Sequence, residues 1–249
     1  MIFKRKKENI IIIGNGETGK AIYGLYGKRQ YNVSIIDIDS PLIDVNNIDV
    51  MNICIPYSKN FIHIVQEYIK QYKPKLTIIH STVLPGTTKQ IWTLNIVYSP
   101  IIGIHPQLFK SLNTFKKFIG ADNKRSLSLA KRHFKKIKIK FIILKNSKTV
   151  ETAKILSTLY YGMCIAFHDD VDKLCNKNNI PFNDVMTKWN TEYNRGYKLL
   201  GKPNVIRPVL TPPKGKIGGH CIIPNAETIK GYFKSDVIEY ILKLKWNLY

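Results

Sequence analysis

Near the C-terminal end of the chain, a cysteine follows two glycines and a histidine in the order Gly218-Gly219-His220-Cys221. The glycines carry no side-chain bulk, so a ligand can approach the backbone and the thiol closely. His220 or another nearby cation could hold the sulfur as a thiolate, the form that attacks a carbonyl carbon. The alternative is a small apolar cysteine buried after a flexible turn. What lies upstream has to decide between these two interpretations.

A second group of residues with chemical potential lies near the N-terminus. The apolar run 8–13 ends at the sequence Gly14-Asn15-Gly16-Glu17-Thr18-Gly19, and residues 20–26 have a helical pattern. A strand, a G-x-G-x-x-G turn and a helix are the arrangement that binds dinucleotides. The first glycine makes the tight turn, the second lets the backbone meet a pyrophosphate, and the third packs the helix on the strand. We therefore expect these six residues to bind a cofactor.

An acidic residue follows at the distance that such a site requires. The predicted second strand, residues 32–37, ends in Asp37, 18 residues after Gly19. A carboxylate there binds the ribose hydroxyls and repels a 2′-phosphate, so the pattern favours NAD over NADP. The alternative is an ordinary glycine-rich turn, with Asp37 at the start of a loop.

The elements that must position these residues alternate between strand and helix over about 145 residues. Further strands are predicted at 50–55, 76–79, 95–98 and 138–144, the last closing the sheet, with helices at 60–71 and 126–136. This alternation predicts an α/β fold with a doubly wound parallel sheet, which binds ligands at the carboxyl ends of its strands. Pro56 and Thr82 follow two such ends and join the cofactor-binding candidates.

From residue 148 the pattern becomes helical. A long helix is predicted over 150–176, a second from Pro181 to about residue 194, a loop over 201–216, and a last helix over 227–248. We therefore expect an NAD-binding Rossmann domain over 1–147. A smaller, all-helical domain over 148–249 would follow it and bring Cys221 toward the nicotinamide.

The composition restricts the classes of function. The formal net charge of +22 allows nucleic-acid binding, but the lysines are spread over the whole chain, and asparagine and isoleucine are also abundant. We expect a solvated lysine-rich surface rather than a nucleic-acid interface. The apolar runs are too short to span a membrane, and no secretory signal is recognisable. Four widely spaced cysteines without a metal-ligand pattern predict free thiols in a reducing cytoplasm and no metal site.

Four blocks, in this order, resemble the UDP-glucose/GDP-mannose dehydrogenase family, the nucleotide-sugar dehydrogenases, over nearly the whole chain. They are Gly14-x-Gly16-x-x-Gly19, Ser81-Thr82-Val83-x-Pro85-Gly86-Thr87-Thr88, Glu151-x-x-Lys154 and Gly218-Gly219-His220-Cys221. The resemblance implies two successive hydride transfers. NAD oxidises a sugar C6 alcohol to an aldehyde, a cysteine captures it as a thiohemiacetal, and a second NAD produces a thioester for hydrolysis. It also implies a homodimer formed through the long helix, here about 150–176.

The resemblance assigns roles to three residues of this chain. Cys221 would be the nucleophile, and Lys154 would stabilise the oxyanion and the thiolate. Thr82 would help to order the catalytic water and would touch the cofactor. The alternatives are a solvated helix lysine for Lys154 and a helix N-cap for Thr82.

Three polar positions depart from the family pattern. Thr158 stands where the family has an asparagine four residues after the lysine, and Asn225 stands where it has an acid four residues after the cysteine. Ile101 replaces the glutamate of a Pro-Glu pair, and His105 in the same loop is a candidate substitute or a plain loop residue. Because a catalytic base typically contributes 10²–10⁴-fold, the chemistry is expected to change. A two-electron dehydrogenase or reductase of a smaller substrate, or a non-catalytic NAD-binding relative, therefore remains open.

The chain is also short for this family, whose members carry a further C-terminal domain that holds the nucleotide. We expect a partner chain to supply that domain, a substrate without a nucleotide, or a degenerate remnant. Residues expected to bind the sugar or nucleotide-sugar substrate are His105, Arg195, Arg207, Gly218 and Gly219. For the arginines, a plain surface role is the alternative.

Overall fold

The structure, a computed structural model, describes residues 7–27, 30–37, 45–212 and 221–243. It consists of two compact units, Met1–Lys154 and Ile155–Tyr249, each of which is considered by itself. The boundary falls inside a long helix, seven residues after the position 147 expected from the sequence. Among the described residues, no helix is long and apolar enough to cross a membrane.

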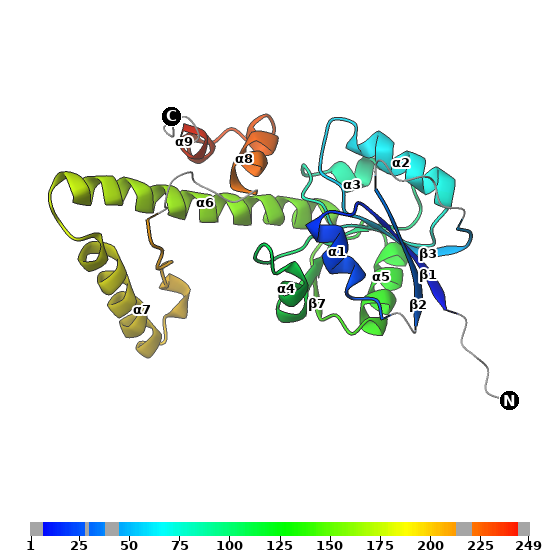
Figure 1. The fold of residues 1–249 in the computed structure, drawn as a ribbon, viewed down its shortest axis with the longest axis horizontal. Coiled ribbons are helices and arrows are strands. Elements are labelled where there is room, and N and C mark those ends of the chain that lie inside the picture. Colours follow the sequence, from blue (N-terminus) through cyan, green and yellow to red (C-terminus); the bar gives the residue numbers. More distant parts are fainter. Residues whose placement is uncertain (1–6, 28–29, 38–44, 213–220, 244–249) are drawn as a thin grey trace. The chain divides into compact units, whose positions relative to one another are not determined.

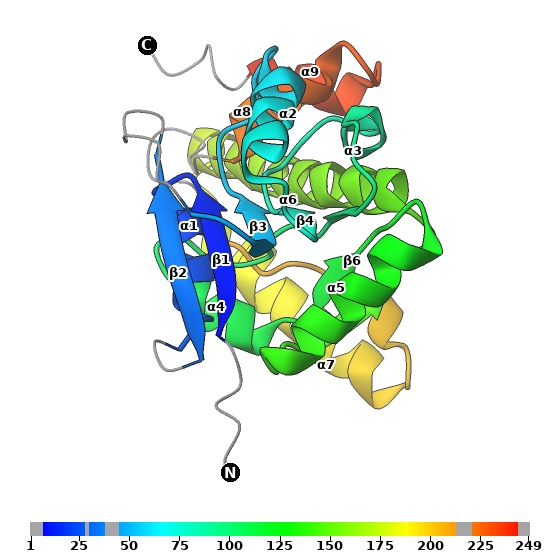
Figure 2. The ribbon, with the colours of Figure 1, turned by 90° about the vertical axis from the view of Figure 1, so that its right-hand side faces the viewer.

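The first unit is built on a parallel sheet of five strands in the order β2-β1-β3-β4-β5 (Figures 1 and 2). The strands are β1 Glu8–Ile13, β2 Tyr31–Ile36, β3 Ile48–Ile53, β4 Thr77–Ile79 and β5 Ile96–Tyr98. The strand order reverses between β1 and β3, and open parallel sheets bind ligands at the carboxyl ends of the strands at such a point. The predicted α/β class with a doubly wound parallel sheet is confirmed.

Helices cover both faces of this sheet, which explains why β1 is a continuous apolar run rather than an alternating one. Ile10 and Ile12 pack on one face, where α1, α4 and α5 lie, and Ile11 and Ile13 pack on the other, where α2 and α3 lie (Figure 1). The helices are α1 Glu17–Tyr23, α2 Phe61–Tyr72, α3 Thr87–Gln90, α4 Leu108–Thr114 and α5 Lys124–Lys136. Each fully buried isoleucine contributes roughly 1.5–3 kcal/mol to stability.

The strand predicted over 138–144 exists, but it does not lie where the sequence suggested. It forms β7, Phe141–Ile143, which pairs in parallel with β6, Lys117–Ile119, in a separate two-stranded ladder. An antiparallel bridge between Tyr98 and Gly120 connects this ladder to the end of β5. The prediction that this strand closes the main sheet is therefore wrong. The three-residue strand β6 begins with a lysine and was not recognised in the sequence.

The second unit is helical. Its first helix, α6 Ser147–Lys177, begins in the first unit, and it is followed by a π-helical segment, Asn183–Lys188, by α7 Trp189–Leu199 and by a 3₁₀ turn, Pro203–Val205. A β-carbon added to Gly162 of α6 would lie 2.6 Å from the side chain of Ile222, the first residue of α8, Ile222–Lys230, so this glycine permits close packing of α6 against α8.

The C-terminal helix predicted over 227–248 is two helices, so that prediction is wrong in its boundaries. They are α8, Ile222–Lys230, and α9, Asp236–Lys243. The chain turns at Gly231, whose missing side chain favours a helix end, and Ser235 precedes the new helix as a residue with good capping chemistry.

Candidate functional site

The glycine-rich turn after β1 has the geometry of a dinucleotide cradle. Gly14 has φ +105°, and its N–H donates to the Ile36 carbonyl at 2.7 Å. A β-carbon at Gly14 would lie 2.8 Å from the Cys54 carbonyl oxygen, and one at Gly19 only 1.9 Å from the Gly14 carbonyl oxygen. No described residue has an atom within 4 Å of the β-carbon position of Gly16, so the described part of the chain leaves this side of the turn open. This geometry is compatible with the three roles that the sequence predicted for these glycines.

Helix α1 begins directly at this turn, three residues earlier than the sequence suggested. Its N-cap is Gly16 and its first residue is Glu17, so the unpaired N–H groups of the first turn surround the open glycine. Asn15 is exposed and Thr18 half-buried. A helix N-terminus favours anions, and a pyrophosphate fits this cradle on both steric and electrostatic grounds.

Three further predicted cofactor residues lie at the same edge of the sheet. Asp37 is half-buried and directly follows β2. The last residue of β2, Ile36, pairs with Ile13 at the end of β1. Pro56 follows β3, whose end is held next to β1 because the Cys54 N–H donates to the Ile13 carbonyl at 2.8 Å. Since parallel strands end at one edge, a dinucleotide on the glycine turn would meet both positions.

Thr82 joins this edge through the residue before it. The Ser81 hydroxyl donates to the Ile55 carbonyl at 2.5 Å, which ties the loop after β4 to the loop after β3. Thr82 itself is half-buried. It does not cap a helix, because α3 begins at Thr87 and has Gly86 at its N-cap. The alternative role considered for Thr82, a helix N-cap, is therefore wrong.

A buried glutamate connects this loop to α6. Glu151 is 0% exposed, and its carboxylate accepts hydrogen bonds from the Gly86 N–H at 2.5 Å, the Thr88 N–H at 2.8 Å and the Thr88 hydroxyl at 2.5 Å. Burial raises the pKa of this carboxyl above its ordinary value, whereas the hydrogen bonds from Thr88 and Gly86 act in the opposite direction. The sequence had marked Glu151 only as part of a block. Its hydrogen bonds to Thr88, 63 residues earlier, bring the block that begins at Glu151 into contact with the block that ends at Thr88.

Lys154 follows Glu151 by one helical turn and is half-buried. Residues three apart lie on the same face of a helix. The hydrogen bonds of Glu151 to the loop after β4 therefore also determine which face of α6 carries Lys154. Thr158 comes four residues later in the same helix and is also half-buried.

The start of the loop after β5 is held by a buried lysine. Lys117 is 3% exposed, and its ammonium donates to the Ser99 and Pro100 carbonyls, each at 2.9 Å. Burial lowers the pKa of Lys117 to about 7. The Ile101 side chain is 7% exposed and packs in the core cluster on the α4 side of the sheet. Position 101 therefore serves packing and offers no base.

His105, from the same loop, lies beside the glycine turn. Its Nδ1 is 2.5 Å from the Glu17 carboxylate, and both side chains are 39% exposed. The structure thus brings His105 to the start of α1, next to the predicted cofactor-binding residues.

The second unit holds the remaining predicted catalytic residues. Cys221 is half-buried and lies at the N-cap of α8, and the Asn225 N–H donates to the Cys221 carbonyl at 3.1 Å. Asn225 is 8% exposed, so its amide faces the interior of this unit. Gly218 and Gly219, expected to bind substrate, lie outside the described residues.

The two arginines expected to bind substrate differ in their surroundings. Arg195 forms an exposed ion pair with Glu192 on the same helix, an arrangement typical of a plain surface cation. The Arg207 guanidinium lies 3.6 Å from the centre of the Tyr193 ring and lines an apolar pocket of about 730 Å³. Cys221 is not among the described residues lining that pocket, so Arg207 and the thiol do not share it.

The first unit thus combines a doubly wound parallel sheet with a glycine-rich turn at the end of β1, and comparison with known proteins shows which chains share this fold. No protein-family model matches the chain. It is 28% identical over 152 residues to a UDP-N-acetyl-D-mannosamine dehydrogenase of Methanococcus maripaludis, covering 59% of this chain and 33% of that one. It is 23% identical over 228 residues to the enzyme of the same name from Methanocaldococcus jannaschii, and this match covers 88% of this chain and 49% of that one. The chain thus spans between a third and a half of these relatives.

Solved structures agree on the fold. A UDP-D-ManNAc dehydrogenase from Pyrococcus horikoshii matches with a TM-score of 0.77 at 16% identity, over 96% of this chain and 68% of that one. A 3-hydroxyisobutyrate dehydrogenase from Mycobacterium tuberculosis matches with a TM-score of 0.68 at 11% identity, over 97% of this chain and 94% of that one. The resemblance expected from the four sequence blocks is confirmed, because the chain is related to the nucleotide-sugar dehydrogenases and is shorter than they are.

Proposed function

We propose that the protein is an NAD-dependent oxidoreductase that acts on an alcohol of a sugar or nucleotide sugar, with Cys221 as covalent nucleophile. The observation that carries this proposal is the open cradle at Gly16, at the point where the strand order reverses. The names of the sequence relatives, UDP-N-acetyl-D-mannosamine dehydrogenases, support a nucleotide-sugar substrate.

The first unit would hold the cofactor, which accepts a hydride when bound. The turn from Gly14 to Gly19 and the first N–H groups of α1 would bind the pyrophosphate. The Asp37 carboxylate would bind the ribose hydroxyls, and Pro56 and Thr82 would border the cofactor from the neighbouring strands. A 2′-phosphate placed near Asp37 would meet a negative charge, which is the physical reason for proposing NAD rather than NADP.

The catalytic roles fall to side chains that could act on a carbonyl carbon. The Cys221 thiolate would add to the aldehyde, and the Lys154 ammonium would stabilise the developing oxyanion. Thr158 and Asn225 stand at the two altered polar positions and would retain hydrogen-bonding capacity without a negative charge. Because Ile101 is buried and apolar, the hydrolysis of a thioester would lack the base of the family pattern and would be slow.

A second candidate is a two-electron dehydrogenase of a smaller substrate. This candidate is favoured by the structural match with the 3-hydroxyisobutyrate dehydrogenase, because this chain covers 94% of that protein's length. At 11% identity the likeness concerns the fold alone. The two candidates differ in the role of Cys221, which only the first requires.

A homodimer through α6 is part of the proposal. Large apolar side chains on this helix are about half exposed in the single chain: Leu156 41%, Tyr160 56%, Tyr161 50%, Phe167 56% and Leu174 59%. An uncovered apolar face of this extent is typical of a protein interface, and a second copy would bury it. A location in a reducing cytoplasm, expected from the four widely spaced cysteines of the sequence, is also part of the proposal.

Titration with NAD and NADP, followed by calorimetry, tests the cofactor assignment. We expect saturable NAD binding and at least tenfold weaker NADP binding, with the preference reduced in Asp37→Ala because the repulsive charge is gone. Equal affinity of the wild type for both cofactors would refute the role of Asp37. Absence of binding to either would refute the proposed function.

A further inference from the structure

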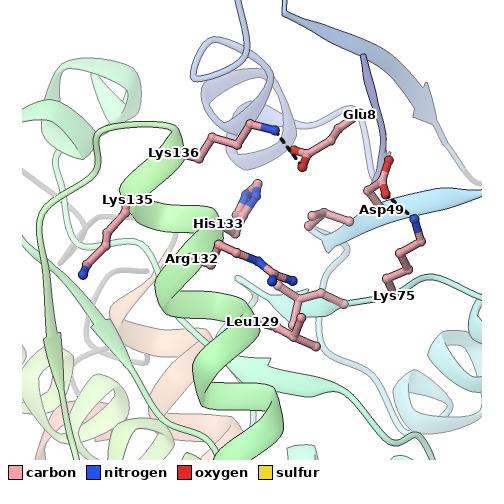
Figure 3. A pocket seen from close by; sticks show the side chains of 10 residues that line it. Glu8, Asp49, Lys75, Leu129, Arg132, His133, Lys135 and Lys136 are labelled. Carbon is pink, nitrogen blue, oxygen red and sulfur yellow. Dashed lines mark hydrogen bonds and ion pairs between the residues drawn. The ribbon is translucent and has the colours of Figure 1, made fainter. Parts of the chain in front are cut away.

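A hollow opens at the edge of the sheet opposite to the glycine turn. It has a volume of about 550 Å³ and lies where β1, β3 and β4 begin, against the C-terminal half of α5 (Figure 3). Glu8 lies at the start of β1 and Gly14 just beyond its end, so the length of the strand, roughly 20 Å, separates the two places. Nothing in the proposed oxidoreductase chemistry uses this hollow.

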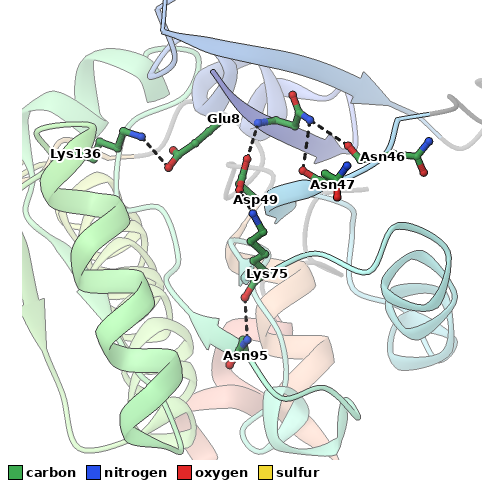
Figure 4. Close-up of polar contacts among 8 residues, drawn as sticks. Glu8, Asn46, Asn47, Asp49, Lys75, Asn95 and Lys136 are labelled. Atoms are coloured by element: carbon green, nitrogen blue, oxygen red, sulfur yellow. Dashed lines mark hydrogen bonds and ion pairs between the residues drawn. The ribbon is translucent and has the colours of Figure 1, made fainter. Parts of the chain in front are cut away.

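Two ion pairs occupy opposite sides of the hollow. The Lys136 ammonium lies 2.7 Å from the Glu8 carboxylate, and the Lys75 ammonium lies 2.7 Å from the Asp49 carboxylate (Figure 4). The other Asp49 oxygen accepts the Asn9 backbone N–H at 2.9 Å. Each ammonium has three donors, so both lysines retain N–H groups for a ligand after pairing with their carboxylates.

Two further cations of α5, Arg132 and Lys135, line the hollow. Figure 3 shows the Arg132 side chain extending from α5 toward the strand edge. Helix α5 contains six Lys and Arg residues and no Asp or Glu, so its surface potential is positive. Glu8 and Asp49 balance two of the cations that line the hollow, so the lining keeps a net positive charge.

The floor of the hollow is apolar. Val50 is 4% and Leu76 2% exposed, and Leu129 is half-buried beside them. At the rim, Glu8 Oε2 is a buried acceptor atom that has no hydrogen-bond partner among the described residues. The lining therefore offers an anion-binding side, an apolar surface and one acceptor, which is the combination expected of a small-molecule site.

We propose that this hollow binds a small phosphate monoester carried on an apolar ring, at a site separate from the dinucleotide cradle. A phosphate monoester carries about −1.5 to −2 charges at pH 7, which matches a guanidinium flanked by two partly engaged lysines. The planar fork of Arg132 binds two phosphate oxygens, Lys75 and Lys136 contribute further N–H donors, and the ring covers Val50, Leu76 and Leu129.

Calorimetric titration of the full chain with phenyl phosphate tests this proposal, because this compound has the required phosphate and ring but is not a dinucleotide. We expect saturable one-to-one binding, with weaker binding of inorganic phosphate and none of phenol. Arg132→Ala should weaken the binding about tenfold or more, since hydrogen bonds to a charged group are lost. Gly16→Ala, which places a methyl group where the dinucleotide cradle would receive a phosphate, should leave it unchanged.

The matched control is Arg125→Ala. Arg125 is also an exposed arginine of α5, but it does not line the hollow. Its replacement should change the affinity by less than about twofold. An equal loss in both arginine variants would mean diffuse attraction to a basic surface, and would overturn the proposal. Absence of saturable binding to the wild type, or loss of binding in Gly16→Ala, would overturn it as well.

Discussion

The carboxylate of Glu151 is expected to stabilise the first unit, and Glu151→Ala measures how much. In the wild type it accepts three hydrogen bonds, from Gly86 and Thr88. The variant leaves the two Thr88 donors buried without an acceptor, at about 1–3 kcal/mol each, while the half-exposed Gly86 N–H can bind water. Removal of a buried carboxylate offsets part of this cost. We therefore expect a loss of about 2–4 kcal/mol in the free energy of unfolding.

Hydrogen exchange is the appropriate assay because the chain has two units, so a single unfolding transition cannot be assumed. Amides of β4 and α3 should exchange faster in Glu151→Ala, in proportion to the lost stability. Glu151→Gln should have a smaller effect, since its amide oxygen can still accept from Thr88 while its NH₂ group faces the Gly86 N–H. Glu67→Ala, at an exposed position on α2, is the control and should change stability by less than about 0.5 kcal/mol. If Glu151→Ala is no more damaging than Glu67→Ala, the reasoning is refuted.

Three other predictions concern the cradle, the pH dependence and the assembly. Gly19→Ala should unfold or strongly destabilise the protein, because its β-carbon would lie 1.9 Å from the Gly14 carbonyl oxygen. Gly16→Ala should leave the melting temperature unchanged and weaken NAD binding, a split that calorimetry and thermal melting would reveal. Burial lowers the pKa of His133 to about 4, so the unfolded chain binds its proton first as the pH falls. The contribution of His133 to the stability of the first unit should therefore be full above pH 6.5 and fall by about 2 kcal/mol between pH 7 and pH 5, so hydrogen-exchange protection should decline less over this range in His133→Gln than in the wild type. Tyr160→Asp should convert a dimer to monomers in light scattering at an unchanged melting temperature of the first unit, whereas a monomeric wild type would contradict the proposed interface.

Local sequence patterns predicted much of the first unit. The run Ile10–Ile13 and the turn that begins at Gly14 identify a strand, a cradle and a helix within a dozen residues, because tight backbone geometry demands glycine where a β-carbon would collide. The position of Asp37 at the same edge of the sheet could be predicted because β2 ends beside β1. Such short-range constraints decide which residue types can occupy a position, so they can be recognised in the sequence.

Long-range contacts could not be predicted in the same way. Glu151 and Thr88 are 63 residues apart, and the pattern around Glu151 shows only an amphipathic helix. Lys117 was not recognised as buried, because a lysine normally predicts a surface position and its partners are backbone carbonyls that no residue type reveals. The separate pairing of β6 with β7 was missed for a related reason, since three-residue strands carry too little periodicity.

The proposed role of Cys221 is tested most directly by the number of NADH molecules formed per substrate consumed. The purified chain would be incubated with NAD and a panel of free and nucleotide-linked sugars that includes UDP-N-acetyl-D-mannosamine. The account predicts NADH formation, and it predicts that Cys221→Ala reduces the yield to one NADH per substrate at most, because the aldehyde can no longer be captured. The same yield in Cys221→Ala as in the wild type, or no NADH from any sugar, would contradict it.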